Sequence, residues 1–292
     1  MTAALIIVRF AHFVSVMALF GGSVFLAALA PAPLRGALGP RLRAARVAAA
    51  LVAAASAVLW LMLEGGEMGG GWRDALDPAV ISTVLYDTAF GHIWQGRLIL
   101  ALAIVIAASW RPAAPPIVTA VLAGLLLASL GLVGHAAMRE GLSGAIERAN
   151  QALHLLAGGF WLGALAPLSV SLGFLDDGAL RGEAATALRR FSGLGHGAVA
   201  LVLATGVVNT FIILGKPPLD FSSPYQASLA LKIACVATMI LVALYNRYRL
   251  VPRLAAAPEA ALRALIRNTF VELALGGAVL GLVSAFATFE PT

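Results

Sequence analysis

The chain is poor in charge and almost free of cysteine. Of its 292 residues, 12% are charged and 61% are hydrophobic, whereas a soluble domain carries about a quarter charged residues. The single cysteine, Cys235, excludes an internal disulfide and any cluster of cysteines around a metal. The composition therefore excludes an ordinary soluble domain and indicates a polytopic membrane protein.

Motifs of several enzyme and carrier classes are also missing. The glycine-rich stretch 65–71 is not followed by the Gly-Lys-Ser/Thr of a phosphate loop, and neither GxSxG nor CxxCH occurs. Nothing marks an ATPase, a hydrolase or a c-type haem protein, so we expect a protein that is not an enzyme. The formal net charge of +6 is typical of cytoplasmic loops in a membrane protein, and we expect no nucleic-acid partner.

Eight apolar segments follow one another along the chain. Each is close to the roughly twenty residues that a helix needs to cross a bilayer, which predicts an all-α bundle of eight transmembrane helices in one domain. The segments are 4–30, 47–63, 93–110, 116–137, 149–173, 191–214, 225–245 and 265–289. In the longest loop, Asp77 and Pro78 predict the cap and first residue of a short helix that ends near Tyr86.

Arginine placement predicts the orientation of the bundle. Thirteen arginines lie in the loops after the odd-numbered segments, and four basic residues lie on the other side. Because cytoplasmic loops carry an excess of lysine and arginine, the arginine-rich loops are predicted to be cytoplasmic. Both termini are then on the outer side, and the first segment is expected to remain as a helix.

His154 opens a long apolar stretch that lacks charge. A histidine within the hydrocarbon is costly and needs a partner or a function. On a helix, His154, Gly158 and Trp161 share one face. Gly159 and Gly163 form a second stripe of small residues, which predicts a close contact with another helix.

Four of the five histidines fall near the outer ends of the predicted helices. His12, His135 and His154 lie on separate helices, and Met138 can share a helix face with His135. Imidazole suits copper, zinc, iron and nickel, and thioether favours Cu(I). We predict a metal site of these three histidines with Met138 as an optional ligand. The alternative is that each histidine is a core residue bonded to a carbonyl or hydroxyl group, and His92 is predicted to be interfacial.

Polar residues also occur deeper in the last three segments. Lys232, Cys235 and Met239 share a helix face, and the two sulfur residues suit a Cu(I) relay, although both also pack as apolar groups. Lys232 needs an acceptor or an aqueous cavity. Glu272 lies at the depth of His196, which predicts a pair that serves either as an inner ion or proton station or as a structural contact.

Short patterns spread along the chain match one known family. They are Gly134-His135-Ala136, the stretch from His154 through Gly-Gly-Phe-Trp-Leu-Gly-Ala-Leu, Arg190-Phe191-Ser192 followed by Gly195, Lys232 with Asn246-Arg247, and Glu272-Leu273 with Gly276. In these the chain resembles the CopD family of bacterial inner-membrane copper-resistance proteins.

The resemblance implies a multi-pass inner-membrane protein, with periplasmic termini, that binds copper and transfers it across the membrane. It also implies a separate periplasmic copper-binding partner of the CopC type. It carries His12, His135 and His154 over as matching positions, while the scarcity of nearby methionine leaves Cu(I) and Cu(II) both open.

Two other functions fit the same residues. A membrane cytochrome of the b type would ligate haem b with His135 and His154, and the glycines beside His154 would make room for the macrocycle. A metal-free scaffold or sensor would use the histidines only for packing.

Overall fold

The computed structural model describes residues 1–110, 114–133, 141–254, 256–286 and 288–289. The described residues form helices joined by turns and contain no strand. The α-helices are α1 (Thr2–Val24), α2 (Ala32–Met68), α3 (Trp72–Ala75), α4 (Pro78–Asp87), α5 (Ala89–Ser109), α6 (Pro116–Ala128), α7 (Gly141–Leu172), α8 (Arg181–Leu214), α9 (Pro224–Tyr245), α10 (Val251–Arg253) and α11 (Pro258–Phe286). Wider π turns extend α1 over Phe25–Leu29 and α9 over Asn246–Leu250, and 3₁₀ turns extend α6 over Ser129–Leu132 and α7 over Gly173–Leu175.

Within the described residues, seven helices are long and apolar enough to cross a membrane. They are α1, α2, α5, α7, α8, α9 and α11 with their extensions. The shorter apolar helix 116–132 stands where the fourth spanning segment was predicted. The prediction of an all-α polytopic membrane protein is confirmed, and the number of eight spans remains a prediction.

Several helices begin well before their apolar segments. α2 starts at Ala32 instead of residue 47, and α8 starts at Arg181 instead of residue 191. The predicted starts were wrong because hydropathy reports only the stretch inside the hydrocarbon, whereas alanine, leucine and arginine continue a helix beyond it. The short helix α4 was predicted correctly, since the Asp77 side chain accepts a hydrogen bond from the Ala79 amide at 2.8 Å.

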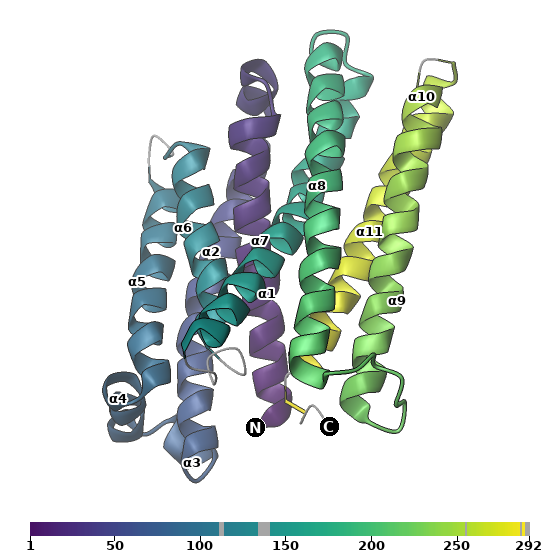
Figure 1. Cartoon of the computed structure of the whole chain (residues 1–292). Coiled ribbons are helices and arrows are strands. Elements are labelled where there is room, and N and C mark those ends of the chain that lie inside the picture. Colours follow the sequence, from purple (N-terminus) through teal and green to yellow (C-terminus); the bar gives the residue numbers. More distant parts are fainter. Residues whose placement is uncertain (111–113, 134–140, 255, 287, 290–292) are drawn as a thin grey trace.

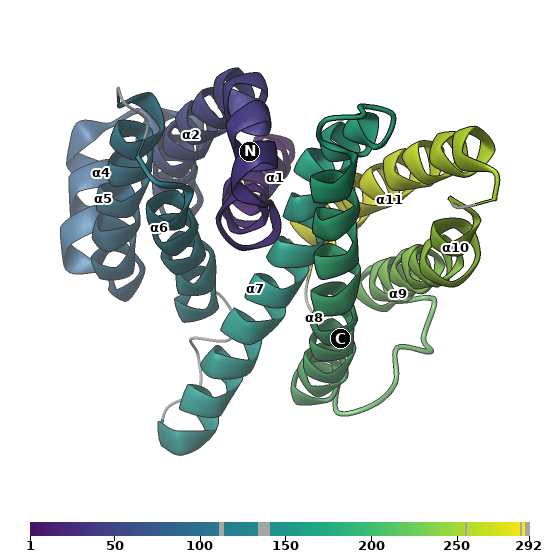
Figure 2. The same ribbon diagram turned by 90° about the horizontal axis from the view of Figure 1, so that it is seen from above.

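The helices form two groups joined by α7. Helices α1, α2, α5 and α6 lie on one side, and α8, α9 and α11 lie on the other (Figure 2). α7 runs obliquely between them, and Figure 1 shows the N-terminus and the last turn of α11 at the end that also carries α3 and α4, opposite α10. Two large hydrophobic cores lie within the described residues: one is built mainly by α1, α2, α5 and α6, and the other joins residues 161–175 to α8, α9, α11 and the junction of α1 with α2.

α1 and α7 meet along glycines, as the small-residue stripe predicts. A Cβ added to Gly163 would overlap the Met17 carbonyl group, and one added to Gly21 would lie 2.5 Å from the Gly159 oxygen. Only glycine permits backbones to approach this closely. This contact sets the tilt of α7 against α1, and the opposite face of α7, which carries Gly158, turns towards Val202 of α8.

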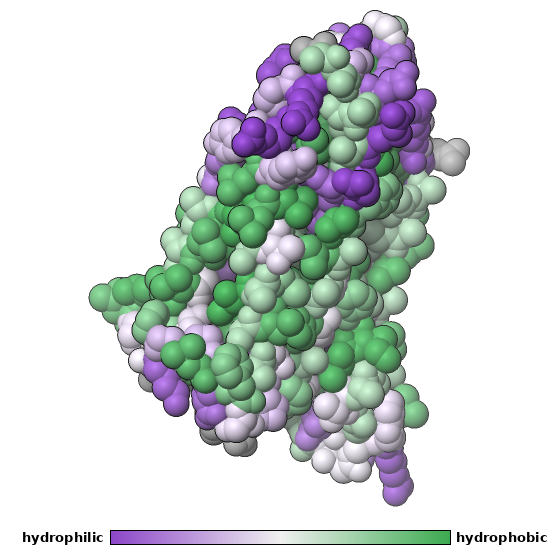
Figure 3. Space-filling view, turned by 90° about the vertical axis from the view of Figure 1, so that its right-hand side faces the viewer, coloured by the Kyte–Doolittle hydropathy of each residue, from purple (hydrophilic) through white to green (hydrophobic). Residues whose placement is uncertain are grey.

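The surface matches that of a membrane protein. In Figure 3 hydrophobic residues form a band across the middle of the visible face. Hydrophilic residues gather most densely at the end where α10 lies. Exposed apolar side chains of the spanning helices include Leu201 and Phe211 of α8 and Leu241 of α9. Lipid tails would cover such side chains. The direction of the two ends relative to the cytoplasm remains a prediction.

Candidate functional site

His154 is held by a threonine on the neighbouring helix. Its Nδ1 lies 2.9 Å from the Thr205 hydroxyl oxygen, and that hydroxyl donates to the Leu201 carbonyl at 2.5 Å. Because the threonine proton is used on the carbonyl, His154 must donate through Nδ1–H. Its Nε2 then carries a lone pair, and the hydrogen bonds of the described residues include none to Nε2, while the ring also interacts with the Val202 backbone.

Side-chain amides surround this pair on the same two helices. Asn150 donates to the Thr205 carbonyl at 3.0 Å and to the Asn209 side chain at 2.8 Å. Asn209 in turn donates to Gln151 at 2.7 Å. The network joins α7 to α8 and restrains the helices that carry the imidazole and its hydroxyl partner, as ligand-orienting networks do in metal sites.

The chain before His135 lies against this part of α7. A Cβ on Gly131 would sit 3.0 Å from the Arg148 carbonyl oxygen and 3.2 Å from the Ala152 nitrogen. Gly131 therefore packs one turn before His154. His135 and Met138 lie outside the described residues, so the structure does not test their part in the predicted site.

His12 has different surroundings and is fully buried. Arg97 donates from Nη2 to His12 Nε2 at 2.7 Å, and His12 Nδ1–H donates to the Ser56 hydroxyl at 3.0 Å. Arg97 also donates from Nη1 to the Leu126 carbonyl at 2.9 Å and to the Ser129 hydroxyl at 2.6 Å. His12 thus belongs to a hydrogen-bonded group that ties α1, α2, α5 and α6 together.

Both nitrogens of His12 are therefore occupied, and its partners lie on α2 and α5, whereas the partner of His154 lies on α8. A cation at His12 Nε2 would have to displace a guanidinium group. Among the described residues, no group of three or more histidine, cysteine, aspartate and glutamate side chains is arranged to hold a metal ion. His12 therefore has hydrogen-bond partners for both ring nitrogens, whereas within the described residues His154 has a hydrogen-bond partner for Nδ1 alone.

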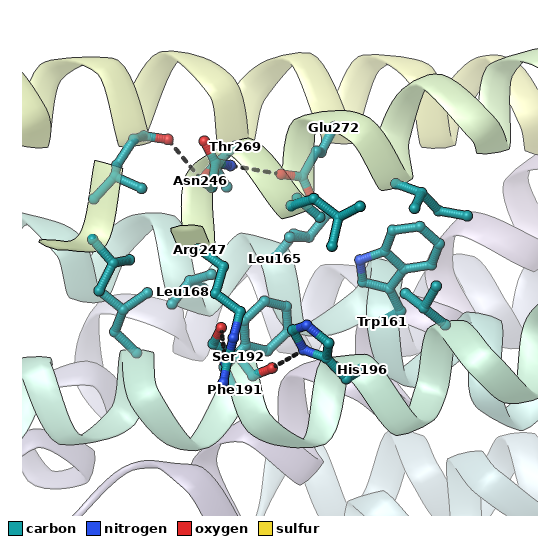
Figure 4. A pocket seen from close by; sticks show the side chains of 18 of the residues that line it. Trp161, Leu165, Leu168, Phe191, Ser192, His196, Asn246, Arg247, Thr269 and Glu272 are labelled. Atoms are coloured by element: carbon teal, nitrogen blue, oxygen red, sulfur yellow. Dashed lines mark hydrogen bonds between the residues drawn. The ribbon is translucent and has the colours of Figure 1, made fainter. Parts of the chain in front are cut away.

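A second group of polar residues lines a cavity of ≈ 110 Å³ between α7, α8, α9 and α11. Arg247 Nη1 donates to the Ser192 hydroxyl at 2.5 Å, which joins the π turn after α9 to α8. Glu272 accepts from Asn246 at 2.9 Å. Figure 4 shows Arg247, Glu272, His196 and Trp161 around this space. Four separate sequence patterns that carried the family resemblance thus meet at one cavity.

The predicted pairing of His196 with Glu272 is wrong. His196 Nδ1–H donates to the Ser192 carbonyl at 2.7 Å, its Nε2 lies 3.4 Å from the Tyr248 hydroxyl, and the side chain is exposed at the cavity rim. Glu272 is buried and turns to Asn246, because the π turn brings the amide next to it. Both residues line the cavity from different helices.

The remaining predicted residues of α9 and α5 are dispersed. Lys232 is half-buried, and its Nζ lies 5.9 Å from the centre of the Phe286 ring, within electrostatic range of His154. Met239 is buried in the second core, and Cys235 is half-buried, so their role as a relay stays a prediction. His92 donates from Nε2 to the Tyr86 carbonyl at 2.8 Å in an exposed position, which fits an interfacial residue.

Two features of these sites were missed in the sequence. Arg97 is 1% exposed, and the signal was a lone arginine within an apolar run, which is rare unless it has partners. The second missed feature is a polar pair on each of two facing helices, its members spaced four residues apart: Asn150 and His154 on α7, and Thr205 and Asn209 on α8. That spacing places each pair on one helix face.

Comparison with known proteins agrees with this architecture. Residues 1–145 match the description "Copper resistance protein D-like, N-terminal domain", and residues 185–286 match "Copper resistance protein D". The inner membrane protein YebZ of Escherichia coli (strain K12) is 38% identical over 286 residues, covering 98% of this chain and 98% of YebZ. No solved structure matches the chain.

Two further relatives are named for copper. Copper resistance protein D of Pseudomonas syringae pv. tomato is 30% identical over 300 residues, covering 98% of this chain and 96% of that protein. The copper transport protein CutJ of Bacillus subtilis (strain 168) is 30% identical over 217 residues, covering 68% of this chain and 38% of CutJ.

The fold and these relatives define a multi-pass helical protein of the bacterial inner membrane. The chain belongs to the copper resistance protein D family, as its sequence patterns indicate, and its membrane function is related to copper.

Proposed function

We propose that the protein binds copper at the outer end of α7 and transfers it across the inner membrane. The observation that carries this proposal is the hydrogen bond from His154 Nδ1–H to Thr205 at 2.9 Å. A histidine that donates through one ring nitrogen presents the other as a metal ligand in a fixed orientation. A relative that is named copper resistance protein D and aligns with 98% of the chain supports copper as the ion.

The other ligands in this proposal are His135 and Met138. Gly131 packs on α7 beside Arg148 and Ala152, and Val133 is the last residue described before His135. The segment described before His135 therefore packs on the part of α7 that precedes His154. His12 is not carried into the site, because Arg97 occupies its Nε2.

The path inward would follow α7 towards the cavity at Glu272. Lys232 is within electrostatic range of His154, and His196, Arg247 and Glu272 line that cavity. We propose that His196, Lys232 and Glu272 tune the field along this path. The protein would act as a carrier and not as an enzyme, with copper delivered by a separate periplasmic protein of the CopC type.

The test is the copper content of the purified protein, wild type against His154→Gln. We expect bound copper in the wild type and its loss in the variant. His92→Gln is the matched control, because His92 is also a lone histidine but bonds only to the Tyr86 carbonyl. Unchanged copper in His154→Gln would remove His154 as a ligand, and a haem absorption band in the wild type would favour a b-type cytochrome instead.

A further inference from the structure

The cavity at Arg247 opens sideways between two helices. α8 packs against α7, and α9 packs against α11, so that the cavity separates α8 from α9. Its rim carries exposed side chains, including His196, Leu244 at 39% and Tyr248 at 60% exposure. A side opening at this position faces the surrounding lipid, because both helices are long and apolar enough to span the bilayer and little of either is buried.

The walls of the cavity are mostly apolar, and its polar groups are few. Leucines of α7, Phe191 of α8 and Ile240 of α9 form the walls. Glu272 accepts a hydrogen bond from Asn246. Arg247 lies over the Tyr248 ring and donates from Nη1 to Ser192, and the hydrogen bonds of the described residues leave its other N–H groups available to a ligand. Such a site suits a ligand with an apolar body and a polar head.

A second cavity with a basic lining lies next to the first one. This second cavity of ≈ 280 Å³ shares Leu188 and Val251 with the first, and it is lined by Arg181 and Arg189 together with Asp176. The arginines outnumber the single carboxylate in its lining. The basic cavity thus lies next to the apolar one, with Leu188 and Val251 lining both, and this arrangement matches the acyl chain and the phosphate of a phospholipid.

We propose that the α8–α9 opening is a binding site for one anionic phospholipid. An acyl chain fills the apolar cavity, and the phosphate binds Arg247 together with Arg189 or Arg181. Basic pockets between spanning helices recognise anionic head groups in this way, and guanidinium pairs with phosphate through two parallel hydrogen bonds. The apolar walls argue for a lipid over free phosphate. This inference does not depend on the proposed copper site at His154, but it concerns the same cavity at Glu272 to which the proposed copper path leads, so that an acyl chain and a copper ion would be alternative occupants there.

The test is native mass spectrometry of protein released from nanodiscs that contain equal amounts of phosphatidylglycerol and phosphatidylcholine. We expect the wild type to retain phosphatidylglycerol. Arg247→Gln should reduce its retention about fivefold, as expected for one basic group near a membrane surface. Arg263→Gln is the matched control, since Arg263 is exposed and pairs with Glu259 at 3.3 Å.

A second variant blocks the cavity without changing its charge. Gly195 lines the cavity, and a Cβ there meets nothing within 4 Å, so Gly195→Leu should fill the space and displace the lipid. Gly197→Leu is its control, because Gly197 also has open space but does not line the cavity. Equal retention in all four variants, or equal retention of both lipids by the wild type, would overturn the proposal. A dimer that Gly195→Leu dissociates would show that a second copy of the chain is the occupant.

Discussion

Replacing Thr205 with valine tests how His154 is held. The Thr205 hydroxyl donates to the Leu201 carbonyl at 2.5 Å and accepts from His154 Nδ1–H at 2.9 Å. Valine keeps a similar shape and removes the acceptor. His154 then loses the contact that sets its tautomer and the direction of Nε2.

The Thr205→Val substitution should weaken copper binding more than it weakens the fold. Removing the group that orients a ligating histidine costs about 10–100-fold in metal affinity, which corresponds to about 1.4–2.8 kcal/mol. The fold should suffer less, because one neutral hydrogen bond contributes about 0.5–1.5 kcal/mol to stability. We therefore expect Thr205→Val to weaken copper binding while the midpoint of thermal unfolding falls only slightly.

Thr210 supplies the matched control on the same helix. Its hydroxyl donates to the Gly206 carbonyl at 2.9 Å, the same four-residue spacing that joins Thr205 to Leu201. Copper titration of the purified proteins against a competing chelator measures both variants. Equal copper affinity in Thr205→Val and Thr210→Val would refute the assignment of Thr205 as the group that positions His154. Recovery of affinity in Thr205→Ser would support it.

Two further predictions concern stability. Gly163→Ala should lower the midpoint of thermal unfolding, since the new Cβ would overlap the Met17 carbonyl group and overpacking costs about 1–3 kcal/mol. Gly158→Ala is the control and should not lower it, because its Cβ would lie 3.9 Å from the Val202 side chain. A similar fall in both variants would contradict the glycine contact between α1 and α7. Arg97→Lys should also unfold at a lower temperature. A single ammonium group cannot reproduce the planar guanidinium group that donates to His12, Leu126 and Ser129, and each of these buried acceptors left without its partner costs about 1–3 kcal/mol. An unchanged unfolding curve would show that the hydrogen bonds of the Arg97 guanidinium group contribute nothing to the stability of the fold.

Local sequence patterns were sufficient for much of the fold. Long apolar runs predict spanning helices because each backbone group must find its partner within the helix when water is absent. The capping role of Asp77 and the contact of Gly159 and Gly163 with another helix also follow from nearest neighbours along the chain. The arginines beyond the hydrocarbon did not mark helix ends, since arginine is itself a good helix former.

Local sequence patterns could not distinguish the role of His12 from that of His154. His12 and His154 look alike in sequence, but Arg97 and Ser56 engage both nitrogens of His12, while Thr205 engages only one of His154. These partners lie 44 to 85 residues away along the chain. Hydropathy and spacing report the cost of burying a histidine, and they carry no information about which distant side chain offsets that cost.

The cavity at Arg247 shows the same division. Sequence alone determined that Ser192, Arg247 and Glu272 belong to family patterns and lie within or next to apolar segments. Only the tertiary structure decided that they surround one space and that Glu272 bonds to Asn246 instead of His196. The physical reason is that the crossing of α7 and the π turn after α9 set the rotation of each helix, and helix rotation decides which polar groups meet.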